Sequence, residues 1–261
     1  MAMKDWRDVL SLIGAGAAKT AMTAGRKVAE GYHAIDPDVT RHLAHVPLLS
    51  FSLFVSRREP IAPGEPDGHP PLIFVHGLGG NRGNFLLMAL YLRLYGRKRS
   101  YKIHFDPGQT IEQMAVALAH FIQDVRQATG SESVDLIAHS MGGLVARLAL
   151  SEPGLDGAAR TLITMGAPHK GTYSARFANT EVTRALRPDS ELMRRLAAMG
   201  WPKGVRGATF FSRNDLFVLP AESATAEGAE AVDATPFTHY SYLIDPRCFV
   251  KVAQALEGKT T

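Results

Sequence analysis

Ser140 lies in the segment with the clearest potential for chemistry. An apolar stretch at residues 134–138 precedes it, and a stretch rich in Ala and Leu follows it. A serine at the tip of a strand–turn–helix has a strained backbone, and the residues two positions away on either side must be small. Ala138 and Gly142 satisfy that requirement. The pattern predicts a nucleophilic serine, and the competing interpretation is an ordinary serine in a tight turn.

A nucleophilic serine needs donors for the negative charge that develops on the attacked carbonyl oxygen. The Met141 amide would lie at the positive end of the following helix, and the Leu78 amide lies in a glycine-rich loop where backbone can approach a substrate. We expect both amides to form an oxyanion hole, although a glycine-rich turn without a ligand would have the same sequence. Substrate contacts are expected from residues in or beside these loops: His76, Gly77, Gly79 and His139.

The general base is found by elimination. In hydrolases built around such a serine, an acid and then a histidine follow the nucleophile along the chain, which leaves His169 and His239. His169 would have to use Asp156 or Glu152, at the far end of the helix after the serine and directed away from it. His239 is therefore the predicted base, in a loop that can reach back over the carboxyl edge of a sheet.

Asp215 is the predicted acid that orients His239. It follows an apolar strand at residues 208–211 through Ser212-Arg213-Asn214, as expected for a carboxylate in a strand-end loop. Its role would be to hold the imidazole tautomer and to stabilise the imidazolium. Asp233 and then Asp189 remain as alternatives.

The elements that position these residues indicate the α/β class, with a mostly parallel central sheet flanked by helices. Short apolar strands alternate with longer helical patterns, which is typical of βαβ units. Strands are predicted at residues 72–75, 101–105, 134–138, 161–165, 205–212 and 231–234, and helices at 111–128 and 249–257. Residues 48–55 also resemble a strand, and the composition of residues 221–231 predicts an exposed loop.

A helical segment at residues 173–205 is predicted to be a lid or cap. Its helix has an apolar stripe and flanking arginines, so it could rest on an acyl chain or on an anionic lipid interface. A buried helix with a solvated basic face is an equally weighted alternative. The stripe residues expected to contact substrate are Leu192, Met193 and Leu196.

The chain resembles small bacterial lipases and class 2-type lipases of the α/β-hydrolase superfamily. Four motifs in order carry the resemblance: residues 76–80, 138–143 and 166–172, and Ser212-Arg213-Asn214-Asp215 leading to His239. The resemblance implies an α/β-hydrolase fold, a triad of Ser140, Asp215 and His239, and oxyanion amides at Leu78 and Met141. It covers about residues 70–256, and Ala138 stands where the motif usually has glycine.

Domain organisation and location follow from composition. With 261 residues, 46% of them hydrophobic, the chain is long enough for one hydrolase domain at residues 51–261, after a helical extension at residues 1–50. That extension could pack on the domain, lie on a membrane surface or pair with a partner. The single Cys248 excludes an intrachain disulfide, and a net charge of +4 gives no reason to expect nucleic acid binding. No clean signal peptide is present, so a cytoplasmic or peripherally membrane-associated location is favoured over secretion.

The predicted reaction is serine-dependent hydrolysis of a carboxylic ester, with a small-molecule ester or a lipid as substrate. It would proceed through an acyl-enzyme on Ser140, and it requires no cofactor and no metal. Thioesterase, amidase, phospholipase and acyltransferase reactions use the same three residues. A non-catalytic module that binds a lipid or a partner on a hydrolase scaffold is the alternative from another class.

Overall fold

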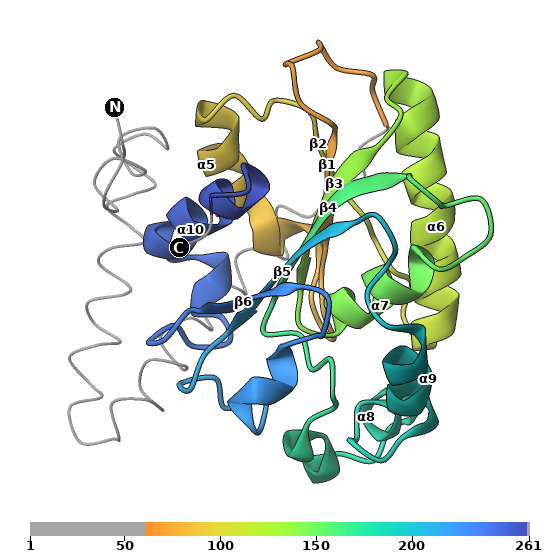
Figure 1. Cartoon of the computed structure of the whole chain (residues 1–261), viewed down its shortest axis with the longest axis vertical. Helices are drawn as coiled ribbons and strands as arrows, with labels where there is room; N and C mark the ends of the chain where they lie inside the picture. Colours follow the sequence, from red (N-terminus) through yellow and green to blue (C-terminus); the bar gives the residue numbers. More distant parts are fainter. Residues whose placement is uncertain (1–60, 260–261) are drawn as a thin grey trace.

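A parallel sheet forms the centre of the molecule (Figure 1). The computed structural model describes residues 61–259, and in that part of the chain six strands pair in the order β2-β1-β3-β4-β5-β6, all parallel. The strands are β1 (Leu72–Val75), β2 (Ser100–Lys102), β3 (Val134–His139), β4 (Ala159–Met165), β5 (Arg206–Phe211) and β6 (Glu230–Asp233). The predicted α/β class with a parallel sheet is confirmed.

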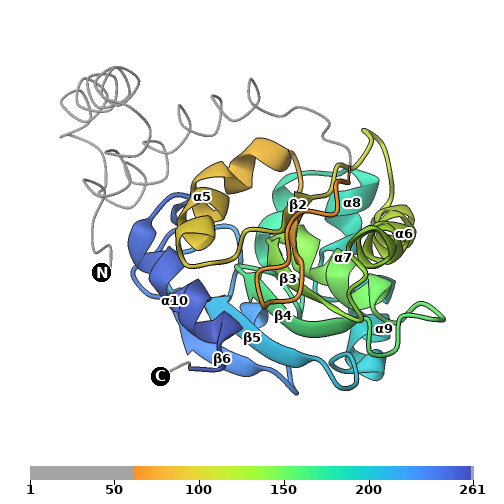
Figure 2. The ribbon, with the colours of Figure 1, turned by 90° about the horizontal axis from the view of Figure 1, so that it is seen from above.

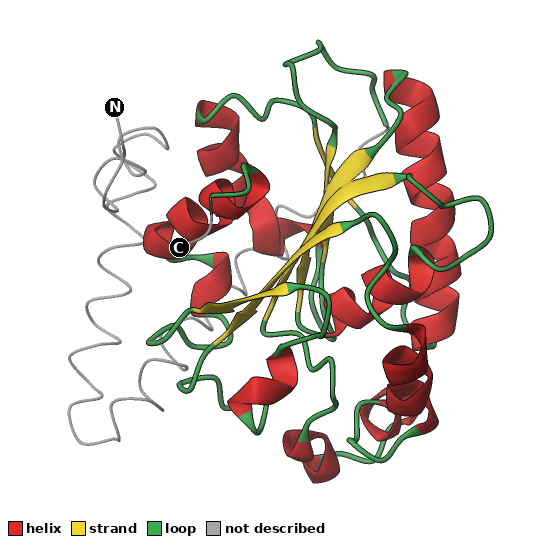
Figure 3. Cartoon of the chain, in the orientation of Figure 1, coloured by secondary structure: helices red, strands yellow, loops and turns green. Residues whose placement is uncertain are grey.

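Helices cover both faces of the sheet, because every connection between parallel neighbours must cross over. The helices are α5 (Leu86–Leu94), α6 (Ile111–Thr129), α7 (Met141–Ala149), α8 (Glu181–Ala185), α9 (Glu191–Met199) and α10 (Pro246–Leu256). Helices α5 and α10 lie on one face and α6 and α7 on the other, as Figures 1 and 2 show. Figure 3 shows the same layering, with the yellow sheet between red helices.

The central strands are fully buried because both of their faces are covered. Successive side chains of β1 point to opposite faces: Ile73 packs in the core beneath α6 and α7, and Phe74 packs in the core beneath α5 and α10. Leu136 and Ile137 divide in the same way on β3. This burial explains why the strands read as continuous apolar runs without alternation.

Helix ends follow local sequence signals. Thr110 and Gln113 form a capping box at the start of α6, and Gly130 ends it with φ 64°. The predicted stop at Gly130 is confirmed. Helix α10 begins at Pro246, with Asp245 as its N-cap, three residues earlier than predicted.

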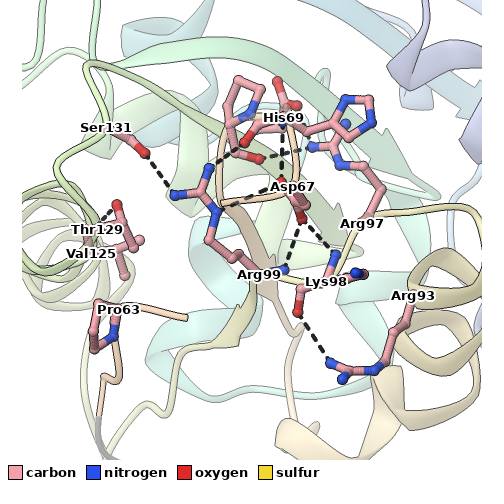
Figure 4. Close-up of polar contacts among 12 residues, drawn as sticks. Pro63, Asp67, His69, Arg93, Arg97, Lys98, Arg99, Val125, Thr129 and Ser131 are labelled. Atoms are coloured by element: carbon pink, nitrogen blue, oxygen red, sulfur yellow. Dashed lines mark hydrogen bonds and ion pairs between the residues drawn. The ribbon is translucent and has the colours of Figure 1, made fainter. Parts of the chain in front are cut away.

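Buried ion pairs hold the amino-terminal edge of the sheet. Asp67 Oδ2 accepts hydrogen bonds from the backbone amides of Lys98 (2.6 Å) and Arg99 (3.1 Å), and the Arg99 guanidinium reaches the His69 carbonyl oxygen at 2.6 Å (Figure 4). Nearby, the fully buried Asp135 pairs with Arg97 and Arg160. These contacts fix the segment that leads into β1, at the opposite edge from the carboxyl ends of the strands.

Four sequence expectations need comment. Strand β2 ends at Lys102, short of the predicted 101–105. The expected exposure of residues 221–231 is wrong at Ser223 and Ala224, which are buried in a short 3₁₀ helix, and at Ala226 just after it. The predicted helical extension at residues 1–50 and the strand at 48–55 lie outside the described residues. No helix within residues 61–259 combines the length and the apolarity needed to cross a bilayer.

Candidate active site

Ser140 has an unusual backbone at the junction of β3 and α7. Its φ of 56° is the only positive φ of a non-glycine residue in the part of the chain that the structure describes. Its amide donates to the Met165 carbonyl oxygen at 2.9 Å. A Cβ on Gly142 would come within 2.6 Å of the Val75 carbonyl oxygen, and one on Gly77 within 2.7 Å of the Ser140 Cβ. Small residues are therefore required around this turn, as the sequence motif indicates.

His239 and Asp215 form a buried hydrogen-bonded pair. The His239 Nδ1 lies 2.8 Å from Asp215 Oδ2, and the two residues are 4% and 2% exposed. The other carboxylate oxygen accepts from the amides of Phe217 (2.8 Å) and Val218 (3.2 Å). Burial alone would raise the pKa of Asp215, but His239 and these donors outweigh it and hold the pKa below its usual value. The ionised carboxylate accepts a hydrogen bond from Nδ1–H of the imidazole, and this tautomer leaves Nε2 as the proton acceptor.

Ser140 and His239 line the same cavity, which has a volume of about 510 Å³. Loops after β1, β3 and β4 contribute to it, together with the loop that carries Phe217. Residues 172–186 close one side through Thr172, Ser174, Thr183 and Leu186, among others. Among the described residues, no Asp, Glu, Lys or Arg lines this cavity, so it is suited to an uncharged group.

Of the two residues predicted to supply oxyanion-hole amides, Leu78 lines this cavity, and Met141 directly follows Ser140, which also lines it. Leu78 occupies the second position of a turn that is closed by a 3.0 Å hydrogen bond from the Gly80 amide to the Gly77 carbonyl oxygen. Met141 is the first residue of α7, where backbone amides have no partner within the helix. Both Leu78 and Ser140 line the cavity wall.

Two further histidines have buried, neutral side chains. His139 lines the cavity but is only 4% exposed, and its Nε2 donates to the His239 carbonyl oxygen at 2.8 Å. Burial, followed by the proximity of His239, lowers the pKa of His139 to about 3. His76 is buried behind the glycine loop, with Nδ1 3.1 Å from the Gly77 carbonyl oxygen, and burial lowers its pKa. His76 is absent from the cavity lining, so this part of the predicted substrate contact is not supported.

Comparison with known proteins links this geometry to a fold. Residues 65–182 match the family model described as a PGAP1-like alpha/beta domain. Over 140 residues the chain is 29% identical to the dihydrolipoyllysine-residue acetyltransferase component of the acetoin cleaving system of Cupriavidus necator, a match covering 48% of this chain and 35% of that protein. The chain thus spans about a third of the length of this curated relative.

Solved structures are similar over most of the chain. The lipase BlEst2 of Bacillus licheniformis in its mature form superposes with a TM-score of 0.63 at 16% identity, covering 78% of this chain and 96% of that one. This chain has the α/β-hydrolase fold. Aspergillus fumigatus lipase B gives a TM-score of 0.61 at 19% identity over 73% of this chain and 53% of the other. A Listeria innocua protein gives 0.57 at 17% identity over 74% and 96%.

The predicted lid contacts need correction. Leu192, Met193 and Leu196 are 5%, 5% and 0% exposed, pack in the core cluster beneath α6 and α7, and do not line the Ser140 cavity. The apolar stripe of an amphipathic helix packs against the core of its own domain, and here α9 contacts α7. The part of the predicted lid that reaches the cavity is the earlier part, residues 174–186.

The rejected alternatives for base and acid have other partners. His169 Nε2 lies 2.9 Å from Thr164 Oγ1, and its Nδ1 faces Arg147 at 3.4 Å. Asp233 pairs with Arg213 at 3.2 Å on the surface. Asp189 is exposed on the segment between α8 and α9. None of these contacts orients His239.

Gly166 is a site residue that sequence reasoning did not single out. Its φ is 56°, and a Cβ there would lie 2.8 Å from Asp215 Oδ2 and 3.1 Å from His239 Nδ1. The available signal was its place in the small-residue loop directly after a strand. In the described residues no group of three or more His, Cys, Asp or Glu could hold a metal ion.

Proposed function

We propose that this chain is a serine hydrolase that cleaves carboxylic esters through an acyl-enzyme on Ser140. One observation carries the proposal. His239 forms a buried 2.8 Å hydrogen bond with Asp215, and it lines the same cavity as Ser140, whose backbone is strained. Ordinary surface residues would not combine these features. The relatives of known structure include proteins named as lipases, which supports hydrolase chemistry.

The geometry suits acyl transfer in two steps. His239 Nε2 accepts the proton of Ser140 as its oxygen attacks the ester carbonyl carbon, and Asp215 stabilises the imidazolium that forms. The Leu78 and Met141 amides would hold the oxyanion. The alcohol then leaves with the proton from His239, and water attacks the acyl-enzyme by the same sequence of proton transfers. No step in this scheme calls for a cofactor.

The cavity supports an uncharged ester or a lipid as substrate. Within residues 61–259 its lining combines apolar side chains with hydroxyl and amide groups, and no Asp, Glu, Lys or Arg contributes to it. Exposed apolar side chains lie on the loops that form or adjoin its walls: Leu78, Tyr173, Phe177, Leu216, Phe217 and Leu219. Such an apolar margin favours an acyl chain or a lipid surface over a soluble polar substrate. The segment 173–186 would then act as a lid.

Turnover and covalent labelling test the proposal together. Wild type, Ser140→Ala and His239→Ala are assayed with p-nitrophenyl esters from acetate to palmitate, and a fluorophosphonate adduct is located by mass spectrometry. We expect labelling at Ser140, loss of turnover in both variants, and wild-type rates in Ser151→Ala, which removes an exposed serine at the end of α7. A folded wild-type protein that neither labels nor hydrolyses any ester would favour the non-catalytic binding module instead.

A further inference from the structure

A second cavity, of about 940 Å³, opens beside α9. Its walls are α9, the loop from Gly200 to β5 and residues 225–228, and Arg147 and His169 contribute from α7 and the loop after β4. It shares no lining residue with the Ser140 cavity. The catalytic proposal leaves this cavity without a role.

Positive charge dominates the lining of this second cavity. Its charged residues are Arg147, Lys170, Arg194 and Arg206 against the single carboxylate of Glu227. None of the four cations forms an ion pair with a carboxylate within residues 61–259. Cations without a carboxylate partner give a concave surface a positive potential, which attracts an anion.

Arg147 is the buried member of this set. It is 4% exposed, and burial lowers its pKa to about 10. Its Nη2 donates to the carbonyl oxygens of Leu196 (2.7 Å) and Gly200 (2.8 Å), and its Nε is buried without a hydrogen-bond partner. The two carbonyls satisfy part of the guanidinium, but they supply no counter-charge. A buried cation without a counter-ion is costly, and an anion placed here would offset that cost.

An apolar platform adjoins these cations. The Trp201 ring lies 5.8 Å from the Arg147 guanidinium carbon, and His169 contacts the same ring edge-on at 5.8 Å between centroids. Burial, followed by Arg147 and Lys170, lowers the pKa of His169 well below its usual value, so this imidazole adds no charge. Met193 and Val205 extend the apolar lining. A ligand with an anionic head and an apolar body would match both parts.

We propose that this second cavity binds an organic anion, with a carboxylate or a phosphate group paired to Arg147 and Lys170 and an apolar body against Trp201. Lys170 is suited to the role because its Nζ is held by a 3.0 Å hydrogen bond to Thr225 Oγ1, and both residues line the cavity. Arg194 stands at the edge, exposed on α9. The inference rests on this cavity alone and does not depend on chemistry at Ser140.

Trp201 provides the readout. The chain has two tryptophans, Trp6 and Trp201, so the full-length Trp6→Phe variant reports on the cavity alone. That variant is titrated at constant ionic strength with octanoate, octyl phosphate, inorganic phosphate and octylamine, by fluorescence and in parallel by isothermal titration calorimetry. We expect saturable binding of octanoate or octyl phosphate and none of octylamine. The affinities for octanoate and octyl phosphate show which anionic head group the cavity prefers. The affinity for inorganic phosphate shows whether binding also needs the apolar body.

Charge reversal locates the binding. Lys170→Glu should raise Kd about ten-fold or more, since a hydrogen bond to a charged group contributes roughly 1.5–3 kcal/mol. Arg194→Glu reverses a charge at the edge of the cavity and should raise Kd by a smaller factor. Arg93→Glu, an exposed arginine on α5, should leave Kd unchanged. Arg147→Met removes the hydrogen bonds to the Leu196 and Gly200 carbonyl oxygens and can destabilise this part of the fold. The test therefore depends on the charge reversals at the exposed residues Lys170 and Arg194. No saturable binding of any anion, or binding that both reversals leave intact, would overturn the proposal.

Discussion

The side chain of His139 holds the backbone of His239. The His139 Nε2 donates to the His239 carbonyl oxygen at 2.8 Å, and the two rings lie 4.5 Å apart between centroids. His139 directly precedes Ser140, so this bond links the loop of the proposed base to the turn of the proposed nucleophile. The pair is buried, so water does not compete for the bond.

Loss of this link should lower the rate of the proposed reaction. We expect His139→Ala to reduce kcat roughly 10- to 100-fold, because a small displacement of a catalytic group is enough to cost that much. His139→Gln can still donate a hydrogen bond, so it should recover part of the rate. His120→Ala, on the exposed face of α6, is the matched control. Equal kcat values for His139→Ala and wild type, at unchanged KM, would show that the bond does not position His239.

Gly166 should tolerate no side chain. A Cβ there meets Asp215 Oδ2 at 2.8 Å and His239 Nδ1 at 3.1 Å, in addition to the strain of φ 56°. Gly154→Ala is the matched control, because its φ is 83° with nothing within 4 Å of the added Cβ. We expect Gly154→Ala to lose about 1–3 kcal/mol of stability in urea unfolding and to keep its activity. Gly166→Ala should lose at least as much stability and most of its ester turnover, and full turnover in that variant would contradict this assignment.

Local motifs made the strained turn at Ser140 and the sheet predictable. The turn around Ser140 requires small residues at fixed offsets and a strand before it, all within ten residues of sequence, so the pattern identifies it without tertiary information. The strand Leu72–Val75 was predicted with its observed bounds, because four buried apolar residues between a proline-rich segment and a glycine loop leave few alternatives.

Long-range contacts were not predictable in the same way. Gly166 is constrained by Asp215 and His239, which are far along the chain. Its place in a small-residue loop after a strand indicates a turn but does not identify these two partners. The apolar stripe that contains Leu196 would have the same sequence pattern whether it faced a substrate or a neighbouring helix. Ser223 looks like an exposed loop residue by composition, yet its carbonyl oxygen accepts from the Lys170 amide at 3.1 Å. In each case the deciding partner is separated in sequence.

The buried histidines should make the fold sensitive to acid. The pKa of His139 is about 3 in the folded state, against an ordinary value of 6.5. Below pH 6.5 this imidazole is therefore protonated in the unfolded chain and stays neutral in the folded one. Stability is therefore full above that pH and falls as the pH drops towards 3. Between about pH 7.5 and 5.0, His139 alone should account for roughly 2 kcal/mol of lost unfolding free energy.

His139→Gln isolates this contribution. Urea unfolding at the two pH values should show a smaller pH-dependent loss in the variant than in wild type, although the variant can differ in absolute stability. The pKa values of His76 and His169 are lowered by burial in the same direction, so part of the acid sensitivity should remain. An identical pH-dependent loss in the variant and in wild type would contradict the neutral, buried state of His139.

Asp135 should be the most costly carboxylate to remove at the amino-terminal edge of the sheet. It is fully buried, and it pairs with Arg97, which is 5% exposed, and with Arg160. Asp135→Asn would leave the buried Arg97 guanidinium without a counter-charge, so we expect a loss of about 3–5 kcal/mol in unfolding free energy. Asp233→Asn breaks the exposed pair with Arg213 and should cost at most about 1 kcal/mol. Because this edge lies away from the Ser140 cavity, Asp135→Asn should keep wild-type KM for esters wherever it remains folded, and a raised KM with unchanged stability would contradict a purely structural role.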